Sequence, residues 1–222
     1  MQFIDVLKQL NIQLLLIESV QSLTDYAKVD LSEDALSKFA VNPANQEELQ
    51  LYLSKIQQKE KAKVLYGGYL EKRNLYANST LFNSNQIRNI HLGLDFWAEA
   101  GTAILAPLDG IVHSAHYNEG EGNYGGTIIL KHQFKDFSFF SLYGHLSKAS
   151  LSLKINSKIK KDEVFCNLGG KYENGNYVPH LHFQWILNLP KDAVDYPGVC
   201  TAYQIEDFAN NSPKPTLSLT NS

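Results

Sequence analysis

Apolar residues near the start of the chain recur at the spacing of an α-helix. Intervals of four and three positions alternate, which places these side chains on one helical face. The stripe consists of Phe3, Leu7, Leu10, Leu14 and Ile17. Asp30 or Ser32 is suited to cap a second helix. Asn42 at the cap and Pro43 in the first turn predict the start of a third. Residues 1–63 are therefore predicted to form a helical N-terminal region.

The pattern changes near residue 64, where glycines, prolines and aromatic residues become frequent and apolar residues alternate with polar ones. The predicted strands lie in the segments 103–115, 124–132, 137–146, 154–170 and 180–187. Segments 103–115 and 154–170 are each expected to hold a pair of strands around a turn. Segments 124–132 and 137–146 are expected to form a hairpin joined through residues 133–136. Many short strands separated by turns predict a mainly β fold, an antiparallel β sandwich or barrel. The expected organisation is a helical region 1–63, a β domain 64–209 and an extended C-terminal tail 210–222.

Composition describes an ordinary globular chain of 222 residues, with 44% apolar and 19% charged residues. This length can bury one core with a smaller appendage. The 20 basic and 23 acidic residues give a net charge of −3, which argues against a nucleic-acid partner. The lysines between residues 55 and 63 are interleaved with acidic residues and are interpreted as a solvated helix face. Cys166 and Cys200 permit at most one disulfide and are expected to be buried thiols or an incidental pair.

The first residues lack the features of an export signal. No basic segment precedes the apolar stretch 14–17, and no small-residue cleavage site follows it. The stretch is also far too short to span a bilayer. The sequence therefore favours a cytoplasmic location without a membrane span, although a non-standard export signal stays an alternative.

Two histidines lie one residue apart in the predicted strand 180–187. Side chains at i and i+2 of a strand point to the same face, so His180 and His182 can share a cavity while Leu181 and Phe183 enter the core. Imidazole is a common zinc ligand and a proton carrier near neutral pH. The alternative for this pair alone is a strand whose polar face carries two histidines.

His91 and Asp95 form a second candidate pair. On a strand, positions 91, 93 and 95 share a face, and Gly93 leaves the space between imidazole and carboxylate open. A helix would also bring positions 91 and 95 together, but alternation through Leu92 and Leu94 favours the strand. Two unrelated surface residues are the alternative.

His145 lies in the predicted strand 137–146, on a face shared with Ser141 and Tyr143. Together, His91, Asp95 and His182 offer two imidazoles and one carboxylate, and catalytic zinc sites commonly have three protein ligands and a position for water. His145 and His180 are then suited to taking the proton of that water and to stabilising an oxyanion. His132 is expected to be an inner histidine with satisfied hydrogen bonds or a group that supports the site. The remaining two, His113 and His116, are interpreted as surface residues.

These motifs, in this order, resemble the zinc metallopeptidases of the lysostaphin/LytM type, peptidase family M23. The resemblance rests on His91-x-x-x-Asp95, on His145 in Tyr-Gly-His-Leu and on His180-x-His182, and it extends over about residues 64–220. It implies zinc bound by His91, Asp95 and His182, with His145 and His180 as catalytic histidines. The implied fold is a mostly antiparallel β structure, the duplicated hybrid motif, with the site in a groove.

Further motifs resemble a subgroup of M23 domains that is also found fused to class III aminotransferases. They are Tyr66-Gly67-Gly68-Tyr69-Leu70-Glu71-x-Arg73-x-Leu75-Tyr76, Glu173-Asn174-Gly175-Asn176 and Tyr196-Pro197-Gly198-Val199-Cys200. Some family members use a tyrosine upstream of the first ligand to hold the oxyanion, and Tyr76 is the nearest here. The absence of an export signal departs from relatives that cut peptidoglycan outside the cell.

The sequence thus predicts a zinc-dependent endopeptidase that hydrolyses short, peptidoglycan-type peptides by means of a metal-activated water. One alternative is a non-catalytic M23-like activator module, whose helical N-terminal region would dock a protein partner. Another is a small-molecule metallohydrolase linked to amine metabolism. All five positions of the site are filled, which disfavours the non-catalytic module.

Overall fold

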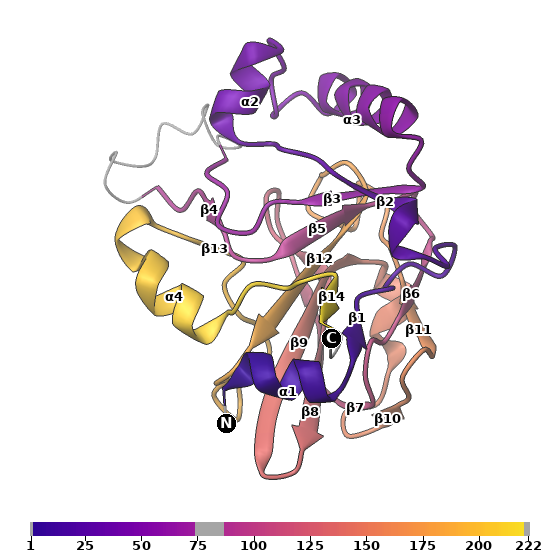
Figure 1. The fold of residues 1–222 in the computed structure, drawn as a ribbon, viewed down its shortest axis with the longest axis vertical. Coiled ribbons are helices and arrows are strands. Elements are labelled where there is room, and N and C mark those ends of the chain that lie inside the picture. Colours follow the sequence, from indigo (N-terminus) through magenta and orange to yellow (C-terminus); the bar gives the residue numbers. More distant parts are fainter. Residues whose placement is uncertain (1, 74–86, 220–222) are drawn as a thin grey trace.

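Most of the chain is arranged around one large β-sheet (Figure 1). The computed structural model describes residues 2–73 and 87–219. Within these ranges, one sheet has the strand order β10 (Lys158–Ile159), β7 (Gly110–Asn118), β8 (Gly125–Phe134), β9 (Phe137–Leu146), β12 (His180–Ile186), β5 (Leu94–Trp97), β3 (Val64–Gly67) and β2 (Tyr26–Lys28). Its neighbouring strands are antiparallel except for β2 and β3, which are parallel. The predicted mainly β fold with N-terminal helices is confirmed.

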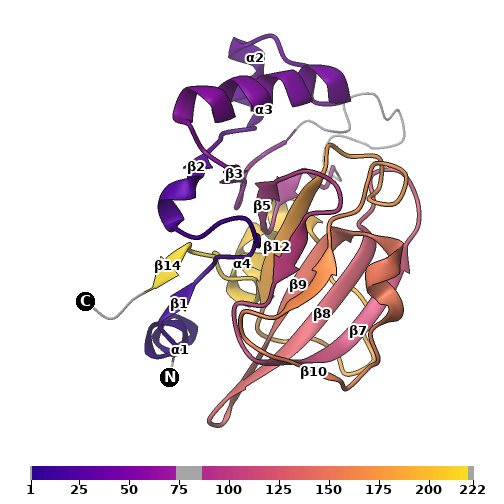
Figure 2. The same cartoon turned by 90° about the vertical axis from the view of Figure 1, so that its right-hand side faces the viewer.

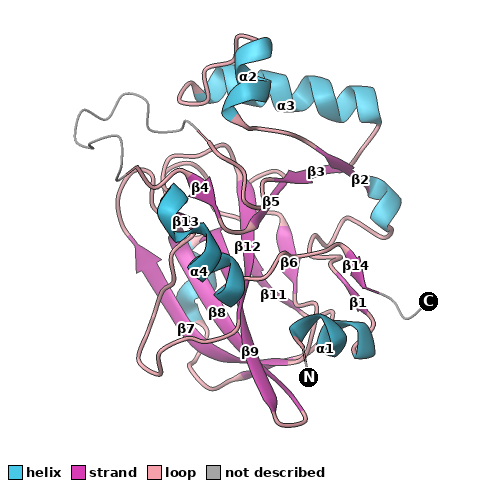
Figure 3. Ribbon diagram, turned by 60° about the vertical axis from the view of Figure 1, so that its left-hand side comes forward, coloured by secondary structure: helices cyan, strands magenta, loops and turns pink. Residues whose placement is uncertain are grey.

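Shorter elements surround this sheet (Figure 3). The two-stranded pairs are β1 (Ile12–Gln13) with β14 (Ser218–Leu219), β6 (Ala103–Leu105) with β11 (Val164–Asn167), and β4 (Ile90–His91) with β13 (Val199–Cys200). The α-helices are α1 (Phe3–Gln9), α2 (Glu33–Lys38), α3 (Gln46–Glu60) and α4 (Ile205–Asn211), and the 3-10 turns are Leu23–Asp25, Lys148–Ser152 and Ala202–Gln204. None of the described helices combines the length and apolarity needed to cross a bilayer.

The longest hairpin follows the predicted pattern closely. Strands β8 and β9 pair in antiparallel register and are joined at Lys135 and Asp136. Lys135 adopts a left-handed conformation with φ of 53°, which such a short reversal requires. Alternation along β12 also holds, because Leu181, Phe183 and Trp185 enter the main core. The opposite face of β12 is thereby left for its polar side chains.

Two predicted strand pairs exist as strands but not as pairs. Across the turn at residues 107–110, β6 pairs with β11 whereas β7 pairs with β8 and β10. Across the turn at residues 160–162, β10 pairs with β7 and β11 pairs with β6. Each turn carries the chain from one sheet to another, so tight turns in the sequence did not identify the pairing partners.

The prediction of one helix from Phe3 to Ile17 is wrong in its length. Helix α1 ends at Gln9, Asn11 has φ of 50°, and Ile12–Gln13 pairs with Ser218–Leu219 near the other end of the chain. Leu14 and Ile17 are nevertheless fully buried in the same core as Phe3 and Leu7. The apolar spacing identified core residues correctly, but pairing with a distant strand overrode the helix.

The other two N-terminal helices are present. Ser32 caps α2 by accepting a hydrogen bond from the Ala35 N–H at 3.3 Å, as predicted. The third helix begins later than expected, because Asn45 rather than Asn42 accepts hydrogen bonds from the first-turn N–H groups. Asn42 instead accepts the Ala44 N–H in the preceding turn.

The first 63 residues form helices α1, α2 and α3, and they also contribute a strand and core side chains to the β domain. Strand β2 joins the sheet through β3, and the Phe3 ring packs against Phe139 and Trp185 with centroids 5.2 and 5.9 Å apart. Helices α2 and α3 lie together beyond the β2–β3 end of the sheet (Figure 2). The domain boundary at residue 64 stays a prediction.

Within the predicted extended tail 210–222, α4 continues to Asn211 and β14 pairs with β1.

Candidate metal centre

Three strands bring the predicted ligands to one place. Strand β12 pairs with β5 so that His182 lies directly opposite Asp95. His91 comes from β4, just before β5 in the chain. Because the alternation of β12 directs Leu181 and Phe183 into the core, His182 faces the other side of the sheet.

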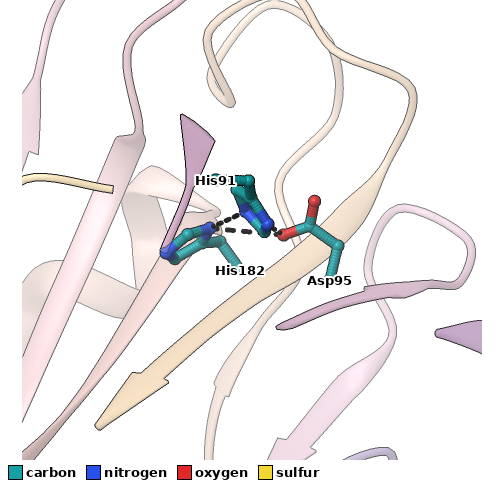
Figure 4. Close-up of side chains that lie close together, drawn as sticks. All are labelled: His91, Asp95 and His182. Carbon is teal, nitrogen blue, oxygen red and sulfur yellow. Dashed lines mark hydrogen bonds and ion pairs between the residues drawn. The ribbon is translucent and has the colours of Figure 1, made fainter. Parts of the chain in front are cut away.

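The ligand atoms of these residues converge (Figure 4). His91 Nε2 lies 2.9 Å from His182 Nδ1, and Asp95 Oδ1 lies 3.2 Å from each of these nitrogens. All three side chains are buried. In a tetrahedral zinc site with ligands at about 2.0–2.1 Å, neighbouring ligand atoms are about 3.3 Å apart. The triangle therefore has the dimensions of one face of such a site.

Gly93 makes this convergence possible, as the sequence indicated. A Cβ atom at this position would lie 2.6 Å from His182 Cε1 and 2.7 Å from the Phe183 carbonyl oxygen. The prediction of a single strand through residues 91–95 needs correction, since the ladder breaks at Leu92 and Gly93. The reason is that the Leu92 N–H donates to the Gly198 carbonyl instead of continuing the β5 ladder.

Hydrogen bonds fix the orientation of both imidazoles. His91 Nδ1–H donates to the Gly68 carbonyl at 2.9 Å, and His182 Nε2–H donates to Gln184 Oε1 at 3.0 Å. The Gln184 amide is itself held, because its Nε2 donates to Ser212 Oγ at 2.8 Å. These bonds leave the lone pairs of His91 Nε2 and His182 Nδ1 directed at the centre of the triangle.

Asp95 is held through its second oxygen. Arg73 Nη1 donates to Asp95 Oδ2 at 2.5 Å, and Arg73 Nε donates to Glu71 Oε1 at 2.7 Å. Burial would raise the pKa of the Asp95 carboxyl, but the electrostatic interactions with the adjacent His91 ring and the Arg73 guanidinium outweigh it and hold that pKa well below its usual range. Asp95 is therefore a carboxylate at neutral pH, and its buried Oδ1 has no hydrogen-bond partner.

His145 and His180 lie beside this triangle. Their ring centroids are 4.3 Å apart, and His180 Nε2 is 3.7 Å from Asp95 Oδ2. His145 Nδ1–H donates to the Asn174 carbonyl at 2.8 Å, and His180 Nδ1–H donates to the Val178 carbonyl at 2.7 Å. Each ring therefore keeps its Nε2 free to accept a proton.

The predicted orientation of His145 is wrong. Tyr143 faces the main core, whereas His145 contacts Tyr124 and His180 on the opposite face of the sheet. The ladder shifts register between Gly126 and Ile128, and His145 has φ of 63°. This β-bulge interrupts the alternation of β9 and turns His145 toward the site.

Burial keeps His91, His145 and His180 neutral. It lowers the pKa of His91 to about 4, together with the charge of Arg73. Burial, reinforced by the neighbouring His180, places the pKa of His145 well below its ordinary value, and burial also lowers the pKa of His180. Neutral imidazoles can bind a cation or accept a proton.

A cavity of about 500 Å³ lies over these side chains. The N-terminal region supplies Leu31, Pro43 and Leu49 to its wall, and the chain after β12 supplies Tyr196 and neighbouring residues. Trp97 stacks on His180 with ring centroids 5.8 Å apart. The candidate site is therefore accessible to a ligand of several atoms.

The donor set fits zinc. Two imidazole nitrogens and one carboxylate oxygen form a common ligand set of catalytic zinc sites. Among the described residues, His91, Asp95 and His182 form the one group of three or more potential ligands whose atoms lie within 4.8 Å of one another. The unpartnered Asp95 Oδ1 is where a cation would satisfy a buried charge.

The remaining histidines and cysteines lie elsewhere. His132 is an inner histidine, with Nδ1 2.8 Å from the Asp109 carbonyl and Nε2 2.7 Å from Ser141 Oγ. His116 is exposed, whereas His113 is half-buried and bonds the Ala193 carbonyl at 3.0 Å. The remaining two candidates, Cys166 and Cys200, are buried free thiols.

Sequence reasoning did not assign roles to several residues of the site. Glu71 and Arg73 entered only as part of a longer motif, and Gln184 only as a strand residue. Tyr124 OH lies 3.4 Å from His182 Nε2. The sequence feature that could have indicated a role for Arg73 is its position two residues after Glu71, which itself directly follows a segment of apolar residues and glycines. On a strand, this spacing places the two opposite charges on the same face. Tyr76 lies outside the described residues.

Comparison with known proteins agrees with this geometry. Residues 89–195 match the model of peptidase family M23. The chain is 31% identical over 99 residues to the peptidoglycan DD-endopeptidase ShyC of Vibrio cholerae, covering 44% of this chain and 20% of that protein. It is 33% identical over 119 residues to a metalloprotease of Buchnera aphidicola, covering 50% and 29%. It is 33% identical over 100 residues to the glycyl-glycine endopeptidase ALE-1 of Staphylococcus capitis, covering 44% and 25%. The chain thus spans less than a third of the length of these relatives.

Solved structures give weaker likenesses. The catalytic domain of lysostaphin from Staphylococcus simulans aligns with a TM-score of 0.37 at 23% identity, covering 64% of this chain and 87% of that one. LytU aligns with a TM-score of 0.40 at 20% identity, covering 66% and 90%. The family match and the sequence relatives carry the assignment. The matched segment holds the buried His-Asp-His triangle and the two adjacent histidines, so residues 89–195 of this chain are similar to peptidase family M23 in both sequence and site residues.

Proposed function

We propose that this protein is a zinc-dependent endopeptidase that hydrolyses short, peptidoglycan-type peptides. The observation that carries the proposal is the triangle of His91 Nε2, Asp95 Oδ1 and His182 Nδ1, with two neutral histidines at its side. The relatives named as endopeptidases and a metalloprotease support the same reaction class.

The residues have separate tasks in this proposal. His91, Asp95 and His182 would hold zinc, which supplies a water of lowered pKa and polarises the scissile carbonyl. His145 and His180 present unprotonated Nε2 atoms to the same cavity, so one accepts the proton of the attacking water. Protonated in turn, they stabilise the developing oxyanion and return a proton to the leaving amine.

The substrate class follows from the relatives and the cavity. ShyC is named as a peptidoglycan DD-endopeptidase and ALE-1 as a glycyl-glycine endopeptidase. The cavity of about 500 Å³ has room for a short peptide segment. We propose a peptide or peptidoglycan fragment as the substrate of this chain.

The subgroup related to aminotransferase-fused M23 domains is part of the proposal. Its support is that each subgroup motif touches the site. Gly68 accepts the hydrogen bond of His91, Asn174 accepts that of His145, and Pro197 accepts one from the Gln184 amide at 3.2 Å. Each of these motifs therefore helps to position a histidine or glutamine side chain of the site.

A set of single variants tests the proposal. The purified protein should bind one zinc ion per chain and release small fragments from pentaglycine or muropeptide libraries, and chelator should abolish this. His145→Ala and His180→Ala should retain zinc and lose at least about 100-fold in hydrolysis. His116→Ala changes an exposed histidine and is the matched control. Full zinc loading with no cleavage of any cell-wall or peptide substrate would refute the endopeptidase.

A further inference from the structure

Asp95 lies at the end of a series of hydrogen bonds that begins at the Leu31 N–H in the N-terminal region and passes through the buried side chains of Glu71 and Arg73. The Leu31 N–H donates to Glu71 Oε2 at 3.1 Å, Glu71 Oε1 accepts from Arg73 Nε, and Arg73 Nη1 donates to Asp95 Oδ2. The side chains of Glu71, Arg73 and Asp95 are 12%, 9% and 1% exposed. A chain of this kind fixes its members because each buried charge is costly to leave unpaired.

The guanidinium occupies a space formed for it. A Cβ atom on Gly68 would lie 2.0 Å from Arg73 Nη2, and Gly68 has φ of 105°. The Arg73 guanidinium also lies over the Trp97 ring, 5.8 Å from its centroid. The absence of a side chain at Gly68 leaves room for the Arg73 guanidinium, and the Trp97 ring packs against it. Both contacts hold Arg73 beside the ligand triangle.

The two oxygens of Asp95 have different partners. Oδ1 faces His91 and His182, and Oδ2 is engaged by Arg73. With Oδ2 committed, a cation in the triangle is reached by Oδ1 alone. A positive guanidinium so near a cation would weaken its binding, but Glu71 offsets that charge. Asp95, Arg73 and Glu71 together carry −1, the charge that Asp95 carries by itself.

We propose that Arg73 is a positioning residue that holds Asp95 as a one-oxygen metal ligand, and that Glu71 keeps this arrangement electrostatically favourable for the metal. The inference rests on the proposed function, because it assumes a metal in the triangle. It gives the segment before α2 a role in the site, since the Leu31 N–H holds Glu71 in place.

The test is a double-mutant cycle on metal affinity. Glu71→Gln, Arg73→Met and the double variant are prepared as full chains, and zinc dissociation constants are measured by competition with a chromophoric chelator. Glu71→Gln leaves the guanidinium charge uncompensated and is expected to weaken zinc binding by about 10- to 100-fold. In the Arg73→Met background the same change is expected to alter zinc affinity by less than about threefold, because Glu71 acts through Arg73.

A conservative variant separates charge from geometry. Arg73→Lys keeps the positive charge but lacks the planar fork that engages Glu71 and Asp95 through separate nitrogens. It is expected to bind zinc more weakly than wild type, with an altered visible spectrum of the Co²⁺-substituted protein. Wild-type affinity and an unchanged Co²⁺ spectrum would overturn the positioning role.

Lys72→Gln is the matched control. Lys72 lies between the two residues, and its ion pair with Glu33 is solvent-exposed, so zinc affinity should stay at the wild-type value. Near-UV circular dichroism and melting of the metal-free proteins establish that each variant is folded. Additive effects of Glu71→Gln and Arg73→Met would refute the coupling. A wild-type protein that binds no zinc would remove the proposed function and this inference with it, and that result is visible before any variant is measured.

Discussion

At the scale of single residues, Gly93 controls the closeness of β5 and β12. Replacing Gly93 by alanine would place a methyl group 2.6 Å from the His182 ring and 2.7 Å from the backbone of Phe183. We expect Gly93→Ala to cost about 1–3 kcal/mol of folding free energy and to weaken zinc binding by at least about tenfold. Chemical denaturation and chelator competition measure the two quantities.

Gly170→Ala is the corresponding control. A Cβ atom there has Ala100 Cβ, at 3.9 Å, as its nearest neighbour, so stability should change by less than about 0.5 kcal/mol. If Gly93→Ala changed the folding free energy and the zinc affinity as little as Gly170→Ala, the close packing of Gly93 against His182 and Phe183 would be refuted.

The buried His132 predicts a pH dependence of stability far from the ligands. Burial lowers the pKa of His132 to about 4, against 6.5 for the unfolded chain. Between these values the unfolded state binds the proton and the folded state does not. The contribution of neutral His132 to the free energy of unfolding is therefore fully present above pH 6.5 and is lost as the pH falls toward 4. The difference corresponds to about 3 kcal/mol.

His132→Gln isolates this contribution. The variant is expected to be less stable at pH 7, but its free energy of unfolding should depend less steeply on pH between 6.5 and 4 than that of wild type. Urea unfolding of the metal-free proteins at several pH values measures the slopes. Parallel curves would show that His132 is protonated in the folded protein or accessible to water.

At the scale of elements, α1 belongs to the main core. Leu7 is 1% exposed and packs in the same cluster as Phe139 and Trp185, whereas Ile4 on the same helix is 38% exposed. We expect Leu7→Ala to destabilise the protein by about 2–5 kcal/mol, and Ile4→Ala by less than about 1 kcal/mol.

The same pair of variants tests the predicted boundary at residue 64. If Leu7→Ala lowers the unfolding midpoint reported by the tryptophans of the sheet, Trp97 and Trp185, residues before the boundary stabilise the β domain. Separate transitions, with the tryptophan signal unchanged, would make residues 1–63 an independent unit.

At the scale of the whole molecule, the ligand triangle links metal binding to folding. Its atoms come from β4, β5 and β12, which are brought together only in the folded chain. Zinc at about 100 times its dissociation constant should therefore add about 2.7 kcal/mol to stability and raise the melting temperature by about 5–10 °C. Differential scanning calorimetry with and without chelator measures the shift.

Variants of the proposed ligand histidines and of the proposed catalytic histidines should differ in their zinc-dependent melting shift. His91→Ala and His182→Ala should abolish the zinc-dependent shift, whereas His145→Ala should retain it. A shift of equal size in all of these proteins would mean that zinc stabilises the molecule at another place.

The mainly β fold, the long hairpin and the common face of His180 and His182 could be predicted from local pattern. Alternation along β12 is a property of a short segment, because successive side chains of a regular strand point to opposite faces. The meeting of His91 and Asp95 with His182 depends on the pairing of β12 with β5, which no local pattern specifies. The same reasoning was wrong for residues 10–17. There the helical spacing gave the buried positions, but the choice between helix and strand depended on Ser218 and Leu219.

The sequence by itself determined which chemistry is available, because residue types and their spacing define the set of two imidazoles and one carboxylate. Tertiary structure decided how that set is supported. The bulge that turns His145 to the site, the amide of Gln184 behind His182 and the Glu71–Arg73 pair behind Asp95 depend on contacts between segments distant in sequence. Local periodicity carries no information on such contacts, because the polar and charged groups that form them are brought together and removed from water only in the folded chain.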